Sequence, residues 1–244
     1  MAPKRKSEQK KPAAASSSKQ ITPNPVTFPP ITEKSELQCQ TVLEDQIIII
    51  EDFFSPLECK EYVKLIESLP LELTPPPKKD EATRVNYRFS VASLDFAAQL
   101  HARLTPHLPS FPYPTSVHPK RRIAPSNDAP RHPDSFNSNI RLYKYTQGQY
   151  FGPHYDDSVK DPLTGATSEW TLLIYLTGTE DGVTGGETLF HRDQRGKPRG
   201  TITPPLKRGS ALLHRHGFEC MLHEGSPVLK GTKYVLRSDL MFMR

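Results

Sequence analysis

One histidine and one aspartate, two positions apart, are the residues in this sequence best suited to hold a metal ion. His154 and Asp156 lie in the segment Tyr-Phe-Gly-Pro-His-Tyr-Asp-Asp at positions 150–157. On an extended chain, residues i and i+2 project from the same face, so an imidazole and a carboxylate can converge on one metal. Such a pair often arises by chance. It predicts a metal centre only if a third ligand comes from elsewhere in the chain.

The C-terminal segment from His223 to Arg237 contains a candidate for that third ligand. We expect His223 at the end of a strand, followed by a turn through Pro227 and Gly231 into another strand. Two histidines and one carboxylate form the facial ligand set of non-haem Fe(II) oxygenases, which leaves coordination positions open. Lys233 can project inward from the second strand. A buried lysine needs an anionic partner, and the distal carboxylate of 2-oxoglutarate would supply one.

Four motifs in the same order resemble the prolyl 4-hydroxylase family of Fe(II)- and 2-oxoglutarate-dependent dioxygenases. The family pattern Tyr-Gly-x-Gly-Gly-x-Tyr-x-Pro-His-x-Asp is met by Tyr145, Gly148, Tyr150, Pro153, His154 and Asp156. Residues 170–176 resemble the strand before a Gly-Gly turn, and Gly-Gly-Glu-Thr-Leu-Phe at 185–190 matches the family segment Gly-Gly-x-Thr-x-Phe, which contains that turn. The pattern His-x3-Pro-Val-x2-Gly-x-Lys is met by His223, Pro227, Val228, Gly231 and Lys233. The resemblance covers residues 85–244 and departs at 146–149, where Thr-Gln-Gly-Gln replaces a glycine-richer turn on the substrate side.

The resemblance implies a mainly β fold with flanking helices, built on a double-stranded β-helix (jelly-roll) core. It implies that His154, Asp156 and His223 bind Fe(II), with no catalytic side chain beyond this metal centre. The implied reaction is the decarboxylation of 2-oxoglutarate to succinate, coupled through O2 to hydroxylation of an unactivated C–H bond. Ascorbate is expected as the reductant that keeps the iron reduced.

Residues around the co-substrate follow from the same resemblance. Lys233 is the implied anchor for 2-oxoglutarate, and the hydroxyls of Tyr145 and Tyr175 are placed to bond it, although either tyrosine can instead be core packing. Arg237 shares a face with Lys233 on a regular strand, so it is an alternative anchor or an ion-pair partner of Asp239.

Other polar residues near these motifs leave two readings open. Arg141 and Tyr143 alternate along a predicted strand and either line the substrate entrance or form a solvated strand face. Core packing is expected for Thr188, and surface or packing roles are expected for three histidines, His191, His214 and His216.

The sequence leaves several classes of substrate open. Our best expectation is a prolyl residue of an intracellular protein; another protein side chain or a small molecule is the first alternative. An AlkB-type nucleic-acid demethylase is disfavoured because Leu229 stands where that group has an arginine, and because residues 21–244 contain 26 basic and 26 acidic residues. A non-catalytic binding module is disfavoured by the intact ligand trio. The oligomeric state stays open.

Sequence composition narrows the expected cellular location of the protein. The 244 residues have no apolar run long enough for a membrane span and no secretory signal, and the three cysteines show no metal or disulfide spacing. We therefore expect an intracellular protein, cytoplasmic or nuclear and not secreted. The net charge of +5 resides in residues 1–20, where Lys4-Arg5-Lys6 and Lys10-Lys11 are either a nuclear import signal or a solubilising tail.

The chain divides into a tail and one domain. Residues 1–40 are rich in Lys, Ser, Ala and Pro and are expected to be disordered, residues 41–138 to form a helical support, and residues 139–244 to form the β core. In the support we predict a strand at 47–50, a helix from the Ser55 cap to about Leu69, a strand or turn at 86–89, and a helix at 94–108. Residues 109–138, with Lys120-Arg121-Arg122, should form a surface loop that could cover the site. The core should contain strands at 139–145, 170–176, 187–191, 201–202, 210–213, 219–223 and 233–242.

Overall fold

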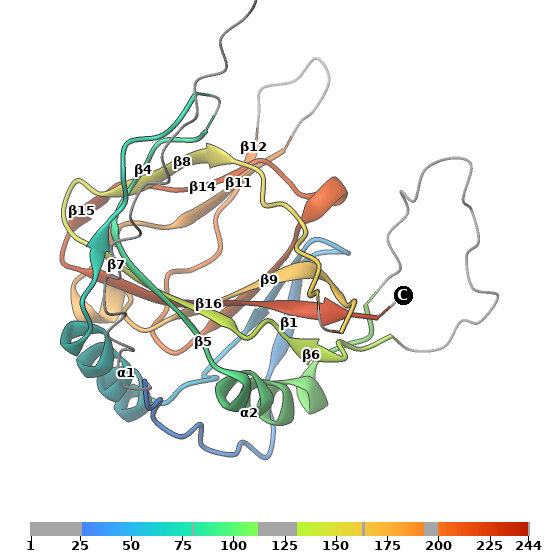
Figure 1. The fold of residues 1–244 in the computed structure, drawn as a ribbon. Coiled ribbons are helices and arrows are strands. Elements are labelled where there is room, and N and C mark those ends of the chain that lie inside the picture. The colour runs from blue at the N-terminus through green and yellow to red at the C-terminus, as the bar shows by residue number, and fades with distance from the viewer. Residues whose placement is uncertain (1–25, 80, 112–130, 163, 193–199, 244) are drawn as a thin grey trace, which may run out of the picture.

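Two antiparallel sheets face each other, with two helices on the outer side of the larger one (Figure 1). The computed structural model describes residues 26–79, 81–111, 131–162, 164–192 and 200–243. Within them, the large sheet has the strand order β1 (Cys39–Leu43), β2 (Ile47–Ile50), β13 (Ala211–Arg215), β9 (Thr167–Tyr175), β16 (Lys233–Phe242), β7 (Asn139–Tyr145), β5 (Tyr87–Ala92), β3 (Glu72–Leu73), with β6 (Ser135–Phe136) beside β16. The small sheet has the order β12 (Gly200–Ile202), β11 (Thr188–Arg192), β14 (His223–Gly225), β8 (Tyr150–His154), β4 (Arg84–Val85). The expected jelly-roll fold, mainly β with flanking helices, is confirmed.

Alternation along the strands of the large sheet separates two cores. On β16, Tyr234, Leu236 and Leu240 belong to the cluster that packs against the helices. Val235, from the opposite face of the same strand, belongs to a second cluster between the two sheets. Lys233 and Arg237 share the face of Val235, so this alternation directs both side chains into the space between the sheets. Polar residues on this inner face are the ones that can form a site.

Helix α1 (Pro56–Ser68) begins as its sequence predicts. The Ser55 side chain accepts from the Glu58 backbone, the Glu58 side chain accepts from the Ser55 backbone, and proline occupies the first turn. Cys59, Tyr62 and Ile66 are buried against the large sheet. The second helix, α2 (Leu94–Leu104), ends earlier than predicted because Pro106 continues it as a short 3-10 turn, η1 (Thr105–His107).

The expectation of disorder is wrong for residues 26–40. Ile31 is buried, and Phe28 stacks on Phe96 of α2 with ring centroids 4.1 Å apart. The Tyr62 hydroxyl donates to the Pro29 carbonyl at 2.7 Å. Two apolar contacts and one hydrogen bond outweigh the polar composition of this segment, because they complete the outer core. Lys4-Arg5-Lys6, Lys10-Lys11 and Lys120-Arg121-Arg122 lie outside the described residues.

Two further sequence expectations need correction. The predicted strand at 219–223 is instead the 3-10 turn η3 (Gly217–Glu219) followed by coil, so His223 begins a strand and does not end one. Strand β8 was not predicted, because Gly152 and Pro153 disfavour strands. It forms through pairing with β14 and β4. Residues 41–138 also contribute β2, β3, β5, β6 and most of β1 to the large sheet, in addition to the two helices.

A backbone contact fixes the start of β13 against the loop before α1. Gly209 has a φ of 78°, and a Cβ atom at this position would overlap the carbonyl oxygen of Phe54. The Phe54 amide donates to the Gly209 carbonyl at 2.9 Å.

Among the described residues, no helix is long and apolar enough to cross a membrane.

Candidate metal centre

The three predicted metal ligands meet at one end of the small sheet. His154 ends β8 and His223 begins β14, and strand register places these two residues directly opposite each other. Asp156 follows β8, and its carboxylate lies 3.7 Å from Nε2 of each histidine. One donor atom from each residue lies within 4.8 Å of the others. This spacing fits a single ion bound by two imidazoles and one carboxylate on one side.

Backbone carbonyls fix the orientation of both candidate imidazole ligands. His154 Nδ1 lies 2.9 Å from the Gly152 carbonyl, and His223 Nδ1 lies 2.9 Å from the Met221 carbonyl. A carbonyl only accepts, so the proton belongs on Nδ1 and the Nε2 lone pair faces Asp156. Burial lowers the pKa of His154 to about 4 and also lowers the pKa of His223. Both rings are therefore neutral near pH 7, which metal coordination requires.

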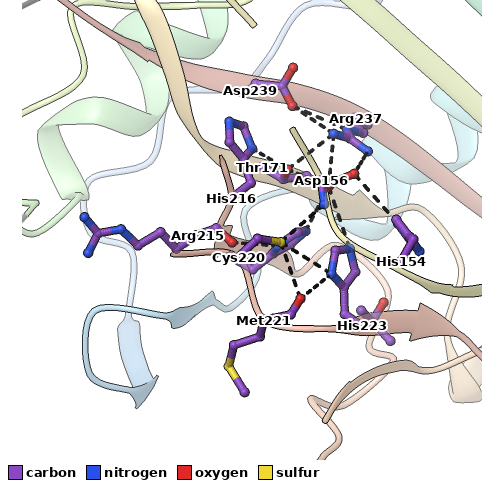
Figure 2. Close-up of polar contacts among 12 residues, drawn as sticks. His154, Asp156, Thr171, Arg215, His216, Cys220, Met221, His223, Arg237 and Asp239 are labelled. Atoms are coloured by element: carbon purple, nitrogen blue, oxygen red, sulfur yellow. Dashed lines mark hydrogen bonds and ion pairs between the residues drawn. The ribbon is translucent and has the colours of Figure 1, made fainter. Parts of the chain in front are cut away.

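Two residues of the large sheet, Arg237 and Thr171, contact the Asp156 carboxylate. Burial alone would raise its pKa, but the Arg237 guanidinium and the surrounding histidines hold the pKa well below its ordinary value. Arg237 contacts both carboxylate oxygens at 3.1 Å, and the Thr171 hydroxyl donates to Oδ2 at 3.0 Å. Arg237 also lies 3.3 Å from Asp239 (Figure 2), as one of its two predicted roles requires. These contacts keep the carboxylate ionised and fix its orientation.

Three further residues, Thr171, His214 and His216, lie beside the trio. The sequence predicts surface or packing roles for the two histidines and does not single out Thr171. Thr171 lies 2.9 Å from His216 Nδ1, and His216 Nε2 lies 2.9 Å from the Ser168 hydroxyl. His214 is buried with Nε2 3.7 Å from Asp156. Alternation along β9 and β13 is the sequence signal that could have directed Thr171 and His214 inward. His191, by contrast, contacts Glu224 at 3.1 Å, away from the trio.

A second trio, His214, Cys220 and His223, also has metal-compatible spacing. Burial raises the pKa of the Cys220 thiol to about 12, so the thiolate that binds metals is scarce at neutral pH. The Asp156 amide already donates to this sulfur at 3.3 Å. The trio with Asp156 needs no deprotonation and is the better ligand set.

Three of the four residues predicted to bind 2-oxoglutarate, Lys233, Tyr145 and Arg237, line the same pocket as the candidate metal trio, whereas Tyr175 is not among its lining residues. Lys233, Tyr145 and Thr188 all border the pocket that contains His154, Asp156 and His223. Lys233 is buried and donates to the Gly186 carbonyl at 2.5 Å, while burial lowers its pKa to about 8. The Tyr175 hydroxyl lies 2.7 Å from the Thr188 hydroxyl, so Thr188 is part of this polar group and not only core packing. Glu187 acts on Lys233 only at a distance, without an ion pair among the described residues, so a bound carboxylate would give the ammonium a direct anionic partner.

Arg141 and Tyr143 lie toward the open side of the pocket. Tyr143 borders both the metal pocket and an adjoining groove, which Arg141 also lines. Arg84, which the sequence did not single out, stacks over Tyr143 at 4.3 Å and over Phe151 at 4.5 Å from the ring centroids. The structure therefore brings together both residues predicted for the substrate entrance and adds a third.

Comparison with known proteins agrees with this geometry. Residues 140–238 match the family model of the 2OG-Fe(II) oxygenase superfamily, a segment that contains the metal trio and Lys233. A prolyl hydroxylase from Trichoplax adhaerens, solved with a peptide fragment of the hypoxia inducible factor oxygen degradation domain, is similar at 13% identity, with 81% of this chain and 84% of that chain covered and a TM-score of 0.51. A Pseudomonas putida prolyl-4-hydroxylase is similar at 10% identity, 82% and 94% coverage and a TM-score of 0.50. No curated protein sequence matches. The resemblance to prolyl 4-hydroxylase-like Fe(II)/2-oxoglutarate dioxygenases is confirmed.

Proposed function

We propose that this chain, whose core is similar to the 2OG-Fe(II) oxygenase superfamily, hydroxylates an unactivated C–H bond while 2-oxoglutarate is decarboxylated to succinate. The observation that carries the proposal is one pocket that contains both a metal-compatible trio and a buried lysine that forms no ion pair with a carboxylate among the described residues. His154, Asp156 and His223 would hold Fe(II), and Lys233 would bind the distal carboxylate of 2-oxoglutarate. When bound, the iron supplies the O2 chemistry that the side chains of the pocket cannot perform.

The protein contributes orientation and protonation state. Carbonyl contacts hold the two imidazoles with Nε2 toward the ion, and Arg237 with Thr171 holds the Asp156 carboxylate. Tyr145 lies near Lys233, whose ammonium is 5.5 Å from its ring centroid, so its hydroxyl is a candidate partner for the co-substrate. Arg237, occupied by Asp156 and Asp239, is better suited to hold the metal ligand than to anchor 2-oxoglutarate.

We further propose a prolyl residue of an intracellular protein as the substrate. The support is analogy: the Trichoplax adhaerens prolyl hydroxylase with the similar fold was solved with a peptide fragment. Ascorbate as reductant and a cytoplasmic or nuclear location belong to the same proposal.

Succinate release tests the chemistry. Purified protein supplied with Fe(II), 2-oxoglutarate, ascorbate and O2 should form succinate, slowly without substrate and faster with it. His154→Ala should abolish release, because one of the three ligands is lost, whereas His132→Ala, at an exposed histidine, should not. Equal release by the wild type and His154→Ala would refute the metal assignment. Mass spectrometry of proline-containing peptides for the gain of one oxygen atom tests the substrate, and loss of a methyl group from nucleic acid would refute the prolyl assignment.

A further inference from the structure

An open groove rich in arginine leads away from the metal pocket along the inner face of the large sheet. Its volume is about 610 Å³, and its lining includes one acidic residue, Glu72. Arg84, Arg88, Arg141 and Arg237 line it together with Ser90 and Asn139. We call these six residues the arginine groove. Arg84, Tyr143 and Arg237 border both the groove and the metal pocket, so the two are continuous. A substrate that reaches the metal from this side passes the guanidinium groups.

Strand register concentrates this positive charge. Arg141 on β7 is directly opposite Arg237 on β16 and directly opposite Ser90 on β5, while Arg88 is opposite Tyr143. Two like charges directly opposite each other destabilise a sheet unless something neutralises them. Asp239 lies 3.3 Å from Arg237 but 3.5 Å from Arg141, so one carboxylate is shared between two cations.

Three of the four arginines have spare capacity to bind an anion. Arg237 is occupied by Asp156 and Asp239. Arg84 donates to the Asn86 side chain at 2.9 Å and also hydrogen-bonds with Tyr143 and Tyr145, but it has no carboxylate in ion-pair range within the part of the chain that the structure describes. The same is true of Arg88, although Glu72 is directly opposite it in β3. The second guanidinium edge of Arg141 is likewise without a second acid among the described residues.

The pKa of the buried Tyr143 hydroxyl shows the effect of these positive charges. Burial alone would raise its pKa, yet the positive charges of Arg84, Arg237 and Arg141 hold the pKa below its ordinary value. The three guanidinium groups therefore stabilise a negative charge in this region. An anionic group of a ligand would be favoured for the same reason.

We propose that the arginine groove binds an acidic side chain of the protein substrate close to the residue that is hydroxylated. This inference rests on the proposed function and specifies its substrate class. A protein is favoured over a nucleic acid because residues 21–244 contain equal numbers of basic and acidic residues, 26 of each. Binding a phosphate backbone requires an extended basic surface, whereas a local group of arginines in a neutral domain matches one or two carboxylates.

Peptide binding without turnover tests the inference. The probes are fluorescent peptides with a single proline and one glutamate at each flanking position in turn, with matched peptides that carry glutamine or lysine there. Anisotropy is measured with full-length protein, Mn(II) and 2-oxoglutarate under anaerobic conditions. At one flanking position the glutamate peptide should bind on the order of tenfold more tightly than its glutamine counterpart, as expected for one charge-assisted hydrogen-bonded pair.

Substitutions then assign the preference to the groove. Arg88→Gln, at an exposed residue, and Arg141→Gln should each reduce the preference for glutamate, and Arg141→Glu should favour the lysine peptide. Arg103→Gln, on helix α2, is the matched control and should keep the preference. Equal binding of the three peptide classes by the wild type, or an unchanged preference in both Arg88→Gln and Arg141→Gln, would overturn the inference.

Two further outcomes separate the alternatives. Tighter binding of a single-stranded oligonucleotide than of any acidic peptide, lost in Arg141→Gln, would overturn the protein-substrate assignment. Because binding is measured without turnover, a failure to release succinate would count against the proposed function alone.

Discussion

Replacement of Lys233 by methionine should stabilise the protein when 2-oxoglutarate is absent. The buried ammonium contacts the Gly186 carbonyl, and burial lowers the lysine pKa from 10.5 to about 8. Each pKa unit corresponds to about 1.4 kcal/mol, so the charge costs roughly 3 kcal/mol at neutral pH. Methionine removes the charge but leaves the Gly186 carbonyl without this donor, which costs about 1 kcal/mol. Lys233→Met should therefore raise the free energy of unfolding by about 2 kcal/mol.

The gain should depend on pH with a defined sign. Below a pH of about 8, Lys233 is protonated in both folded and unfolded chains, and the full cost is present. Between about 8 and 10.5, the unfolded chain binds the proton and the folded chain does not, so wild-type stability rises with pH relative to the variant. The advantage of Lys233→Met should shrink across this interval.

Addition of 2-oxoglutarate should reverse the order of stability. Its distal carboxylate would pair with the ammonium, so 2-oxoglutarate with Mn(II) should stabilise the wild type far more than Lys233→Met. Urea unfolding, with and without the co-substrate, measures both effects at neutral pH and at a pH above 8. Lys230→Met, at an exposed lysine on β15 (Val228–Lys230), is the control and should change neither. The reasoning is refuted if Lys233→Met is less stable than the wild type at neutral pH, or if 2-oxoglutarate stabilises both equally.

Other substitutions probe the supports of the site and of the fold. Thr171→Val should weaken metal binding by about tenfold, because Asp156 loses a donor; competition with a chelator measures this, and unchanged affinity would contradict the role. Glu169→Ala should lower the free energy of unfolding by roughly 3 to 5 kcal/mol, since it removes a buried pair with Arg131 whose two contacts are each 2.7 Å. Urea unfolding measures this loss, and a loss below 1 kcal/mol would contradict it. Gly209→Ala should cost at least about 1 to 3 kcal/mol in the same assay from its positive φ, and a stable variant would show that the turn tolerates a side chain.

The sequence predicted strands well where alternation was clear. Strands β7 and β16 have the predicted bounds because apolar residues alternate along them toward the two cores. Strand β8 escaped prediction because Gly152 and Pro153 have poor strand propensity, and only pairing with neighbours explains it. The segment at 219–223 looked like a strand, but a glycine turn at Gly217 breaks it.

The sequence predicted the candidate metal ligands but not the hydrogen bonds and ion pairs that orient them. Spacing in the motifs was enough to bring His154, Asp156 and His223 to one point, and their role as ligands stays a prediction. The residues that hold Asp156 come from β9 and β16, and no local spacing relates them to it. Such contacts depend on how the two sheets pack, which sequence patterns do not specify.

The contacts of Arg237 and Thr171 with Asp156 also bear on how the domain tolerates loss of its ion. All three candidate ligands come from the small sheet or the loop after β8, while Arg237 and Thr171 belong to the large sheet. An ion pair across the sandwich therefore already joins the two layers at the position where an ion would sit. Unlike a zinc finger, which collapses when stripped by a chelator, this domain should remain folded and exchange its ion reversibly. Iron supply could then regulate its activity without regulating its lifetime.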